Sequence, residues 1–241
     1  MDDAQTPSDW DTSAQAWISI QGTEGDWGRR HVLDRPMMDR VTRWTFDRAL
    51  DIGCGEGRFC RMMKAAGLDA VGVDPTERFV EQARTLDETG EYRVGLAEAL
   101  VFEDAHFDLA VFYLTLCDIA DFQVAIREAV RVLRPGGILL IANLQPFNTC
   151  ATAQGWTREA DGSRRFSIDH YFDERTEWIA WSGVRVRNWH RPLEAYMKAF
   201  LDAGLSLTHF AEPLPQGVTG EKADRYRRVP NFLIMEWRKP G

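Results

Sequence analysis

The chain has 241 residues, of which 44% are hydrophobic and 27% charged, and this composition excludes a disordered chain. No run of eighteen apolar residues occurs, so no membrane span is expected, and the acidic, polar first residues lack the pattern of a secretory signal. The formal net charge of −8 argues against a nucleic-acid-binding protein, because such proteins usually present a basic face. We therefore expect a cytoplasmic protein, monomeric or homodimeric, with neither nucleic acid nor a membrane as partner.

The four cysteines stand at positions 54, 60, 117 and 150 and form neither a CxxC pair nor a Cys/His metal spacing. Three of them lie in or beside expected core elements. We interpret them as reduced, buried thiols, and we expect no metal site.

Residues 1–46 are expected to form a helical cap. From residue 47 on, short apolar segments alternate with amphipathic ones, and we expect strands at 49–52, 70–74, 91–95, 107–116 and 138–143. Helices are expected at 57–67, 76–86 and 121–134, and Pro135-Gly136-Gly137 ends the last of them. This alternation predicts a doubly wound, Rossmann-like α/β core over residues 47–143, with a mostly parallel sheet.

Residues 144–191 interrupt the alternation. The stretches RRFSIDHYF, EWIAW and VRVRNW alternate with period two, and we expect an antiparallel meander that forms a lid after the fifth strand. Residues 192–241 return to the core with a helix that ends at Gly204 and two last strands, which gives a seven-stranded sheet. Seven of the nine tryptophans lie in 1–43 or 144–191, so the aromatic residues concentrate outside the core.

Three glycines, Gly53, Gly55 and Gly57, follow the first strand and open the next helix. At such a turn backbone N–H groups point outward, and glycine lets a ligand approach the main chain. A dinucleotide fingerprint needs its third small residue at position 58, which is Arg58, and no Lys-Ser/Thr pair follows to make a P-loop. Asp74 ends the second strand, where a carboxylate can accept from both ribose hydroxyls. The pattern indicates an adenosine-containing ligand other than a dinucleotide.

Five segments in order resemble the successive motifs of class I S-adenosylmethionine-dependent methyltransferases, in their small-molecule, type 11 branch. They are LDIGCGEGRF, VGVDPTERFVEQAR, GLAEAL, FDLAVFYLTLCDIAD and LRPGGILLIAN, and they span roughly residues 45–145. The resemblance implies S-adenosyl-L-methionine as the cofactor. It also implies an enzyme that transfers the methyl group to oxygen, nitrogen or carbon of a small organic acceptor beneath the lid.

The resemblance also implies roles for the matching positions. Gly53, Gly55 and Gly57 would admit the methionine part of the cofactor, Asp51 would orient their loop, and Asp74 would hold the ribose. Further positions would line the adenine or the methionyl part, namely Pro75, Thr76, Ala97, Glu98, Phe112, Tyr113 and Leu114.

Some of these positions allow a second interpretation. Asp51 could be a buried structural carboxylate, Asp74 a helix cap as well as a ribose ligand, and Tyr113 a plain core residue. Leu96 departs from the family pattern, which often has an acid there to accept from the adenine amino group, so that contact must come from elsewhere.

An oxygen or carbon acceptor usually needs a base to remove its proton. His190, between the lid and the last core helix, is the first candidate, with Tyr113 as a second catalytic candidate and His170 as another histidine that could face the acceptor. A structural role for either histidine remains open. Arg30 is expected to reach the cofactor carboxylate from the N-terminal cap, or else to be exposed.

Two other classes of function remain open. The protein could bind the cofactor without catalysis, as a sensor or a partner-activating subunit. A nicotinamide-dependent oxidoreductase is disfavoured by Arg58. The stretch FYLTL stands where enzymes that methylate the amino groups of nucleic acids resemble one another in an Asn/Asp-Pro-Pro-aromatic sequence, which leaves a small organic acceptor.

Overall fold

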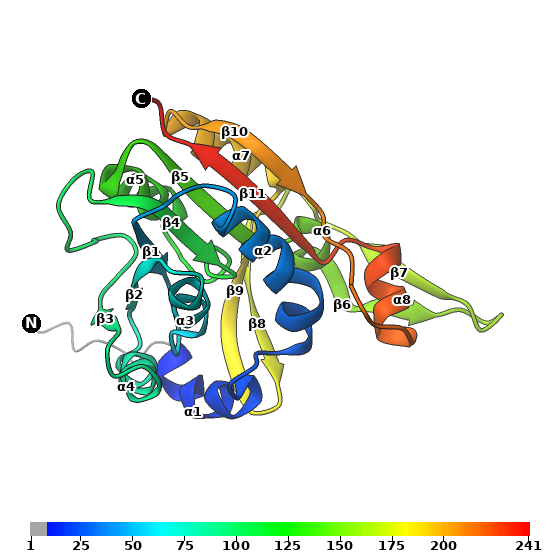
Figure 1. Cartoon of the computed structure of the whole chain (residues 1–241). Helices are drawn as coiled ribbons and strands as arrows, with labels where there is room; N and C mark the ends of the chain where they lie inside the picture. Colours follow the sequence, from blue (N-terminus) through cyan, green and yellow to red (C-terminus); the bar gives the residue numbers. More distant parts are fainter. Residues whose placement is uncertain (1–8) are drawn as a thin grey trace, which may run out of the picture.

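A seven-stranded sheet forms the centre of the molecule (Figure 1). The computed structural model describes residues 9–241, except for the side chains of residues 152–154. The strand order is β10-β11-β5-β4-β1-β2-β3. The strands are β1 (Arg48–Ile52), β2 (Asp69–Asp74), β3 (Glu91–Val94), β4 (Phe107–Tyr113), β5 (Leu133–Leu144), β10 (Ser206–Ala211) and β11 (Phe232–Arg238). Because β11 runs antiparallel to both β5 and β10 while the other pairs are parallel, the predicted seven-stranded, mostly parallel sheet is confirmed.

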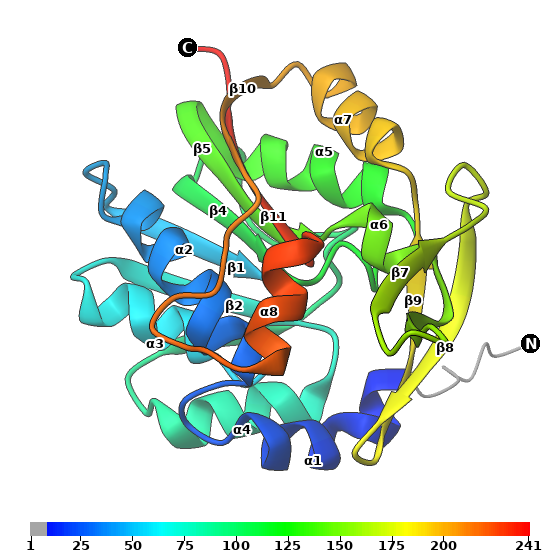
Figure 2. The ribbon, with the colours of Figure 1, turned by 90° about the vertical axis from the view of Figure 1, so that its right-hand side faces the viewer.

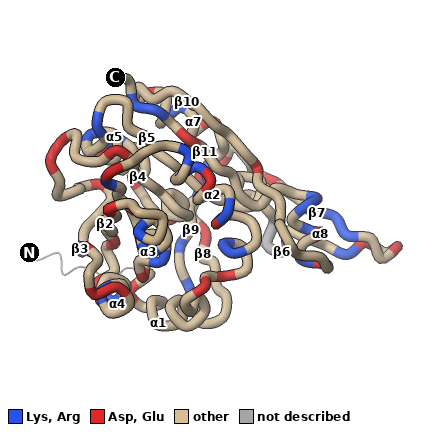
Figure 3. Tube along the Cα trace, in the orientation of Figure 1, with Lys and Arg blue, Asp and Glu red and all other residues tan. Residues whose placement is uncertain are grey.

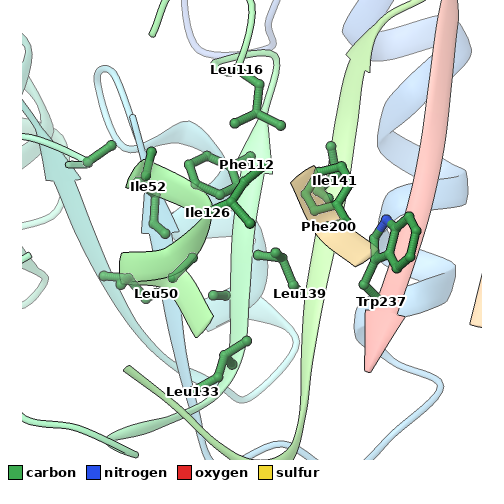
Figure 4. Packing of buried hydrophobic residues seen from close by; sticks show 14 of the residues in the cluster. Leu50, Ile52, Phe112, Leu116, Ile126, Leu133, Leu139, Ile141, Phe200 and Trp237 are labelled. Carbon is green, nitrogen blue, oxygen red and sulfur yellow. The ribbon is translucent and has the colours of Figure 1, made fainter. Parts of the chain in front are cut away.

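Helices cover both faces of this sheet (Figure 2). On one face, α5 (Phe122–Val132) packs over Leu50 and Ile52 of β1, while α7 (Leu193–Asp202) packs over β11, where Phe200 stacks on Trp237 (Figure 4). On the other face, α3 (Arg58–Ala65) and α4 (Glu77–Leu86) pack over Ala49. Neighbouring residues of a strand point to opposite faces, so strands buried on both faces read as the continuous apolar runs seen in the sequence.

The N-terminal segment divides into two parts. The π-helix η1 (Arg29–Leu33) and α2 (Asp34–Val41) bury Leu33 and Met37 in the sheet cluster that α3 and α4 also join. The helix α1 (Asp9–Gln21) instead lies beside α4 and β9 (Val184–His190). Of the helical cap predicted over residues 1–46, η1 and α2 therefore belong to the layer of helices over the sheet.

The segment after β5 forms two hairpins rather than one meander. After the short helix α6 (Pro146–Thr149), β6 (Ala151–Arg158) pairs with β7 (Arg164–Ile168), and β8 (Arg175–Trp181) pairs with β9. Between β7 and β8 the chain turns at His170, whose φ of 51° lies in the left-handed region and is incompatible with a continuing strand. This turn separates the two hairpins.

The free edge of β9 is covered by α1. The backbone N–H of Arg185 donates to Ser13 Oγ at 3.0 Å, and that hydroxyl donates to the Arg185 carbonyl at 3.0 Å. The backbone N–H of Arg187 donates to Asp9 Oδ2 at 3.2 Å. Side chains of α1 thus satisfy main-chain groups that an edge strand leaves unpaired.

Neither the short helix α6 nor α8 (Glu221–Arg228) has a counterpart among the predicted elements. Helix α8 buries only Ala223, so its sequence lacks the apolar periodicity that predicts a helix. Figure 3 shows basic residues gathered over β7 and α8, and the pair Arg164–Glu221 at 2.5 Å joins these two elements. Within residues 9–241, no helix has both the length and the apolar character needed to cross a bilayer.

Candidate functional site

A pocket opens at the carboxyl ends of β1, β2 and β4, where the order of the strands reverses. This is the position at which open α/β sheets bind their ligands. The empty space amounts to about 1080 Å³, including space open to solvent. Its lining comes from the loops after β1, β2, β3 and β4 and from α1, and Trp10 and Trp17 of α1 form what we call the roof.

The glycine loop joins β1 to α3 under the pocket. Gly53 and Cys54 donate their backbone N–H groups to the Val73 carbonyl at 2.7 and 3.0 Å, which fixes the loop on β2. Gly55 has a φ of 55°, and nothing lies within 4 Å of the place where its Cβ would be. Gly53 and Gly55 line the pocket.

Gly57 is not part of the pocket lining. Its φ is 75°, and a Cβ there would lie 2.5 Å from the Tyr92 ring and 2.9 Å from Ala83. The third glycine is therefore required by packing against β3 and α4, which corrects the prediction that it admits the cofactor.

Asp74 lies at the end of β2, buried against the same loop. Its Oδ2 accepts from the N–H of Gly55 and its Oδ1 from the N–H of Thr76, both at 2.9 Å. Burial raises the pKa of Asp74 to about 6, and these hydrogen bonds oppose the rise. The N-cap of α4 is Thr76, without a side-chain cap, so the expectation that Asp74 caps this helix is wrong. Each Asp74 oxygen keeps a second lone pair and can accept from a ligand.

Asp51 is buried at the end of β1. Its Oδ2 accepts from the Cys60 thiol at 3.6 Å, while Oδ1 has no hydrogen-bond partner among the described residues. Burial raises the pKa of Asp51 to about 7. A buried carboxylate oxygen without a partner is costly, and a ligand with a donor group would relieve that cost.

The far end of the pocket is formed by the loops after β2 and β3. Four residues predicted to lie beside the adenine line it, namely Pro75, Thr76, Ala97 and Glu98. Leu96 joins them, and Thr76 Oγ1 is buried without a hydrogen-bond partner among the described residues.

Tyr113 and Phe112 differ although they are neighbours on β4. Tyr113 lines the pocket, donates its hydroxyl to Asp34 Oδ1 at 2.8 Å, and packs edge-on against Phe59. Phe112 points to the opposite face, is fully buried in the cluster of α5 and α7, and lies outside the lining. The prediction that Phe112 lines the cofactor is wrong, because strand alternation allows only one of the two neighbours to face the pocket. Leu114 follows Tyr113 and lines the pocket as expected.

The arginine of the N-terminal segment that reaches the pocket is Arg29, not Arg30. Arg30 is exposed. The Arg29 guanidinium lines the pocket, pairs with Asp26, and lies 5.0 Å from the Trp17 ring centroid. Burial alone would raise the pKa of Asp26, but Arg29 overrides this and lowers it to about 2.

His190 lies outside the pocket lining and is fully buried. Its Nε2 is 2.8 Å from the Tyr171 carbonyl, which can only accept, so Nε2 carries the proton. Its Nδ1 lies 2.7 Å from Thr149 Oγ1 and accepts from it. With both ring nitrogens engaged and its pKa lowered by burial, His190 is a structural residue, and the prediction of a catalytic base is wrong. His170 is exposed beside Asp173 and also lies outside the lining.

Besides Glu56 of the glycine loop, which lines the pocket, two acidic side chains of this region were missed by the sequence interpretation. Asp34 of α2 binds both terminal nitrogens of the pocket residue Arg58, at 2.9 and 2.5 Å, besides accepting from Tyr113. Asp118, in the loop after β4, lines the pocket and accepts from Asn188 of β9. Neither has a local sequence signal, because their partners come from distant segments.

Comparison with known proteins agrees with this architecture. Residues 50–141 match the family model of a methyltransferase domain. The malonyl-[acyl-carrier protein] O-methyltransferase of Erwinia billingiae is 31% identical over 129 residues, which cover 54% of this chain and 51% of that protein. The ubiquinone biosynthesis O-methyltransferase of Chelativorans sp. is 35% identical over 101 residues, 40% of each chain. This chain thus spans about half, or less, of the length of these curated relatives.

A solved structure extends the similarity over more of the chain. The S-adenosylmethionine dependent methyltransferase from Mesorhizobium loti superposes with a TM-score of 0.72 at 28% identity, over 80% of this chain and 90% of that one. The sheet order, the pocket at the glycine loop and the matched domain all agree with the resemblance of the five sequence segments. The chain is similar to S-adenosylmethionine-dependent methyltransferases, in sequence over its central domain and in fold over most of its length.

Proposed function

We propose that the protein transfers a methyl group from S-adenosylmethionine to a small organic acceptor. The observation that carries this proposal is the charge of the pocket. Its lining holds five acidic side chains, Asp51, Glu56, Asp74, Glu98 and Asp118, against the two guanidinium groups of Arg29 and Arg58.

Both guanidinium groups are already paired with carboxylates outside the lining, Arg29 with Asp26 and Arg58 with Asp34. The remaining negative charge suits a ligand that carries a sulfonium and an ammonium group, and it repels the pyrophosphate of a nicotinamide dinucleotide. This supports a methyl donor over a hydride donor.

The residues present fit the cofactor. The buried Oδ1 of Asp51, without a partner among the described residues, would accept from the cofactor ammonium. The free lone pairs of Asp74 would accept from the ribose hydroxyls. Arg29, which reaches the pocket in place of Arg30, would contact the methionyl carboxylate, and Gly53 and Gly55 would allow its close approach.

The bound cofactor supplies an electrophilic methyl group on a sulfonium. Positive charge disappears during an in-line displacement, so the protein contributes mainly position, which supplies up to roughly 7–11 kcal/mol in the best intramolecular reactions. Trp10 and Trp17 lie over the pocket and would exclude water from it. The curated relatives named above are O-methyltransferases, which supports oxygen as the acceptor atom here.

Calorimetry with S-adenosylmethionine, S-adenosylhomocysteine and NAD tests the cofactor. We expect the first two to bind and NAD not to bind, and NAD binding alone would refute the proposal. Mass analysis of metabolite extracts incubated with methyl-labelled cofactor tests the transfer. Labelled product is expected, whereas cofactor binding without any labelled product would favour a sensor or partner subunit.

A further inference from the structure

Three segments far apart in the sequence meet at Asp118. Asp118 lines the pocket, as do Thr115 and Ile119 of the same loop. The side-chain amide of Asn188, on β9, donates to Oδ1. The Trp10 side chain of the roof lies close to the same carboxyl and lines the same pocket. Both neighbours are neutral.

The loop that carries Asp118 is held in place by the end of β9 and the residue after it. The Trp189 N–H donates to the Cys117 carbonyl at 2.6 Å. The buried guanidinium of Arg191 donates to three carbonyls of the loop, those of Leu116, Ile119 and Ala120, at 3.1, 2.8 and 2.9 Å. The loop begins at Leu114, whose φ of 60° is a strained conformation for leucine, of the kind that persists where surrounding contacts impose it.

Asp118 is not among the residues that we assign to cofactor binding. Asp51 and Asp74 lie at the ends of β1 and β2, Glu98 follows β3, and all three line the pocket. Asp118 follows β4 and lies against Trp10, which packs edge-on against Trp17 with ring centroids 5.3 Å apart. A carboxyl group beside two indoles forms a surface for a flat molecule with one polar group.

We propose that Asp118 binds the methyl acceptor, and that it selects a flat acceptor carrying a hydroxyl or amine over one that presents a carboxylate. This inference rests on the proposed function. The acceptor's hydroxyl or amine donates to the Asp118 carboxylate. That proton passes to Asp118 as the oxygen or nitrogen takes the methyl group, and the sulfur keeps the electron pair of the broken bond. A carboxylate has no such proton and would bring a second negative charge to Asp118.

Burial raises the pKa of Asp118 to about 7, which suits a group that accepts a proton near neutral pH. The Asn188 amide holds the orientation of the carboxylate, and the positive charge of Arg29 and the negative charge of Asp74 also act on its pKa, in opposite directions. A change that removes both oxygens of the Asp118 side chain would leave the Asn188 amide without this partner.

Three probes that share a ring and differ in charge test the inference on the protein saturated with S-adenosylhomocysteine. By calorimetry at pH 8, benzylamine and phenol should bind at least about tenfold more tightly than benzoate. The ammonium of benzylamine and the hydroxyl of phenol can donate to the Asp118 carboxylate, whereas the carboxylate of benzoate is repelled by it. Asp118→Asn keeps an oxygen for Asn188 but removes the charge. It should reduce the preference for benzylamine over benzoate by about tenfold and leave S-adenosylhomocysteine affinity within about twofold.

Asp121→Asn is the matched control. Asp121 lies three residues further on, outside the pocket lining, and caps α5 by accepting from Val124. Asparagine caps a helix as well as aspartate does, so this variant removes one charge from the same loop and should leave the order of the three probes unchanged.

The outcomes separate the two proposals. Benzoate binding as tightly as benzylamine to the wild-type protein overturns the inference, and so does an unchanged preference in Asp118→Asn. The order of probe affinities in the wild-type protein tests the inference even if the Asp118→Asn variant does not fold. Absence of S-adenosylhomocysteine binding overturns the proposed function itself, whereas S-adenosylhomocysteine binding without a charge preference among the probes overturns only the inference.

Discussion

The two sides of the pocket are built in different ways. The cofactor side consists of the loops after β1, β2 and β3, where each side chain lies within a few residues of a strand end. The side that we propose for the acceptor, the acceptor side, consists of Trp10, Trp17 and Asp118, which come from α1 and the loop after β4. Asn188 of β9 binds Asp118. The first side follows from local rules of strand, turn and helix, whereas the second exists only once distant segments have packed together.

The largest expected effect concerns the cofactor side: the free energy of unfolding should depend on pH through Asp51. Burial raises the pKa of Asp51 from 3.8 to about 7. Near pH 4 the Asp51 carboxyl of the folded protein is protonated, and its contribution to the free energy of unfolding is present. As pH rises towards 7 the unfolded chain loses its proton first, so stability falls. A shift of about three units corresponds to roughly 4 kcal/mol, and urea unfolding from pH 4 to 8 should show wild type losing that much more than Asp51→Asn.

A ligand sharpens this prediction. We propose that the cofactor ammonium contacts Asp51. Saturating S-adenosylhomocysteine should therefore make the slope of unfolding free energy against pH nearly the same in wild type and in Asp51→Asn. The same comparison with Asp118→Asn should be insensitive to S-adenosylhomocysteine, since Asp118 belongs to the acceptor side. Equal slopes for wild type and Asp51→Asn without ligand would show that Asp51 is ionised across this range.

The second effect is a loss of cofactor affinity in Asp74→Ala. Removing the carboxylate that is proposed to accept from two ribose hydroxyls should weaken S-adenosylhomocysteine binding by roughly 1.5–3 kcal/mol, measured by calorimetry. Asp69→Ala is the control, because Asp69 lies at the opposite end of β2 and pairs with Arg48. Equal affinities of the two variants would remove Asp74 from the site.

His190→Ala should affect folding and not turnover. The variant leaves Thr149 and the Tyr171 carbonyl without their partner, which should cost roughly 1–3 kcal/mol of unfolding free energy. Turnover per folded molecule should stay within about twofold. His190→Gln offers a side-chain N–H to the same carbonyl and should recover part of the stability. A large fall in turnover at unchanged stability would restore His190 as a base.

The smallest effect is expected from Arg30→Ala. Arg30 is exposed, and surface substitutions of this kind usually change stability by less than about 0.5 kcal/mol. Its neighbour Arg29 lies in the pocket between Asp26 and Trp17, so Arg29→Ala should weaken S-adenosylhomocysteine binding measurably. Identical binding by both variants would contradict the assignment of Arg29 to the cofactor.

The sheet and the cofactor side were predictable because their signals are local. The apolar runs of β1, β4 and β5 give the strands, and the spacing of Gly53 and Gly55 before α3 gives the turn. Asp74 followed from its place at the end of a strand. Phe112 and Gly57 were assigned to the ligand wrongly. A motif does not show which of two neighbours on β4 faces the pocket, nor which glycine is required by packing instead of by a ligand.

The features that depend on contacts between distant segments were not predictable in the same way. Arg29 and Arg30 differ by one position, and the π-helix that selects between them leaves no mark in a 3.6-residue periodicity. The satisfied ring of His190 depends on Thr149, which lies 41 residues away. Asp118 is identified through Asn188, 70 residues further along the chain, and no spacing rule connects them.

The contact between α1 and β9 has a consequence for how such an enzyme can change during evolution. Ser13 and Asp9 bind backbone N–H and C=O groups of Arg185 and Arg187, and every residue except proline presents these groups. Substitutions along β9 can therefore accumulate while the helix stays docked. Acceptor preference can then be altered by changing side chains of α1 and the hairpin, and the cofactor loop on β1 and β2 need not change with them.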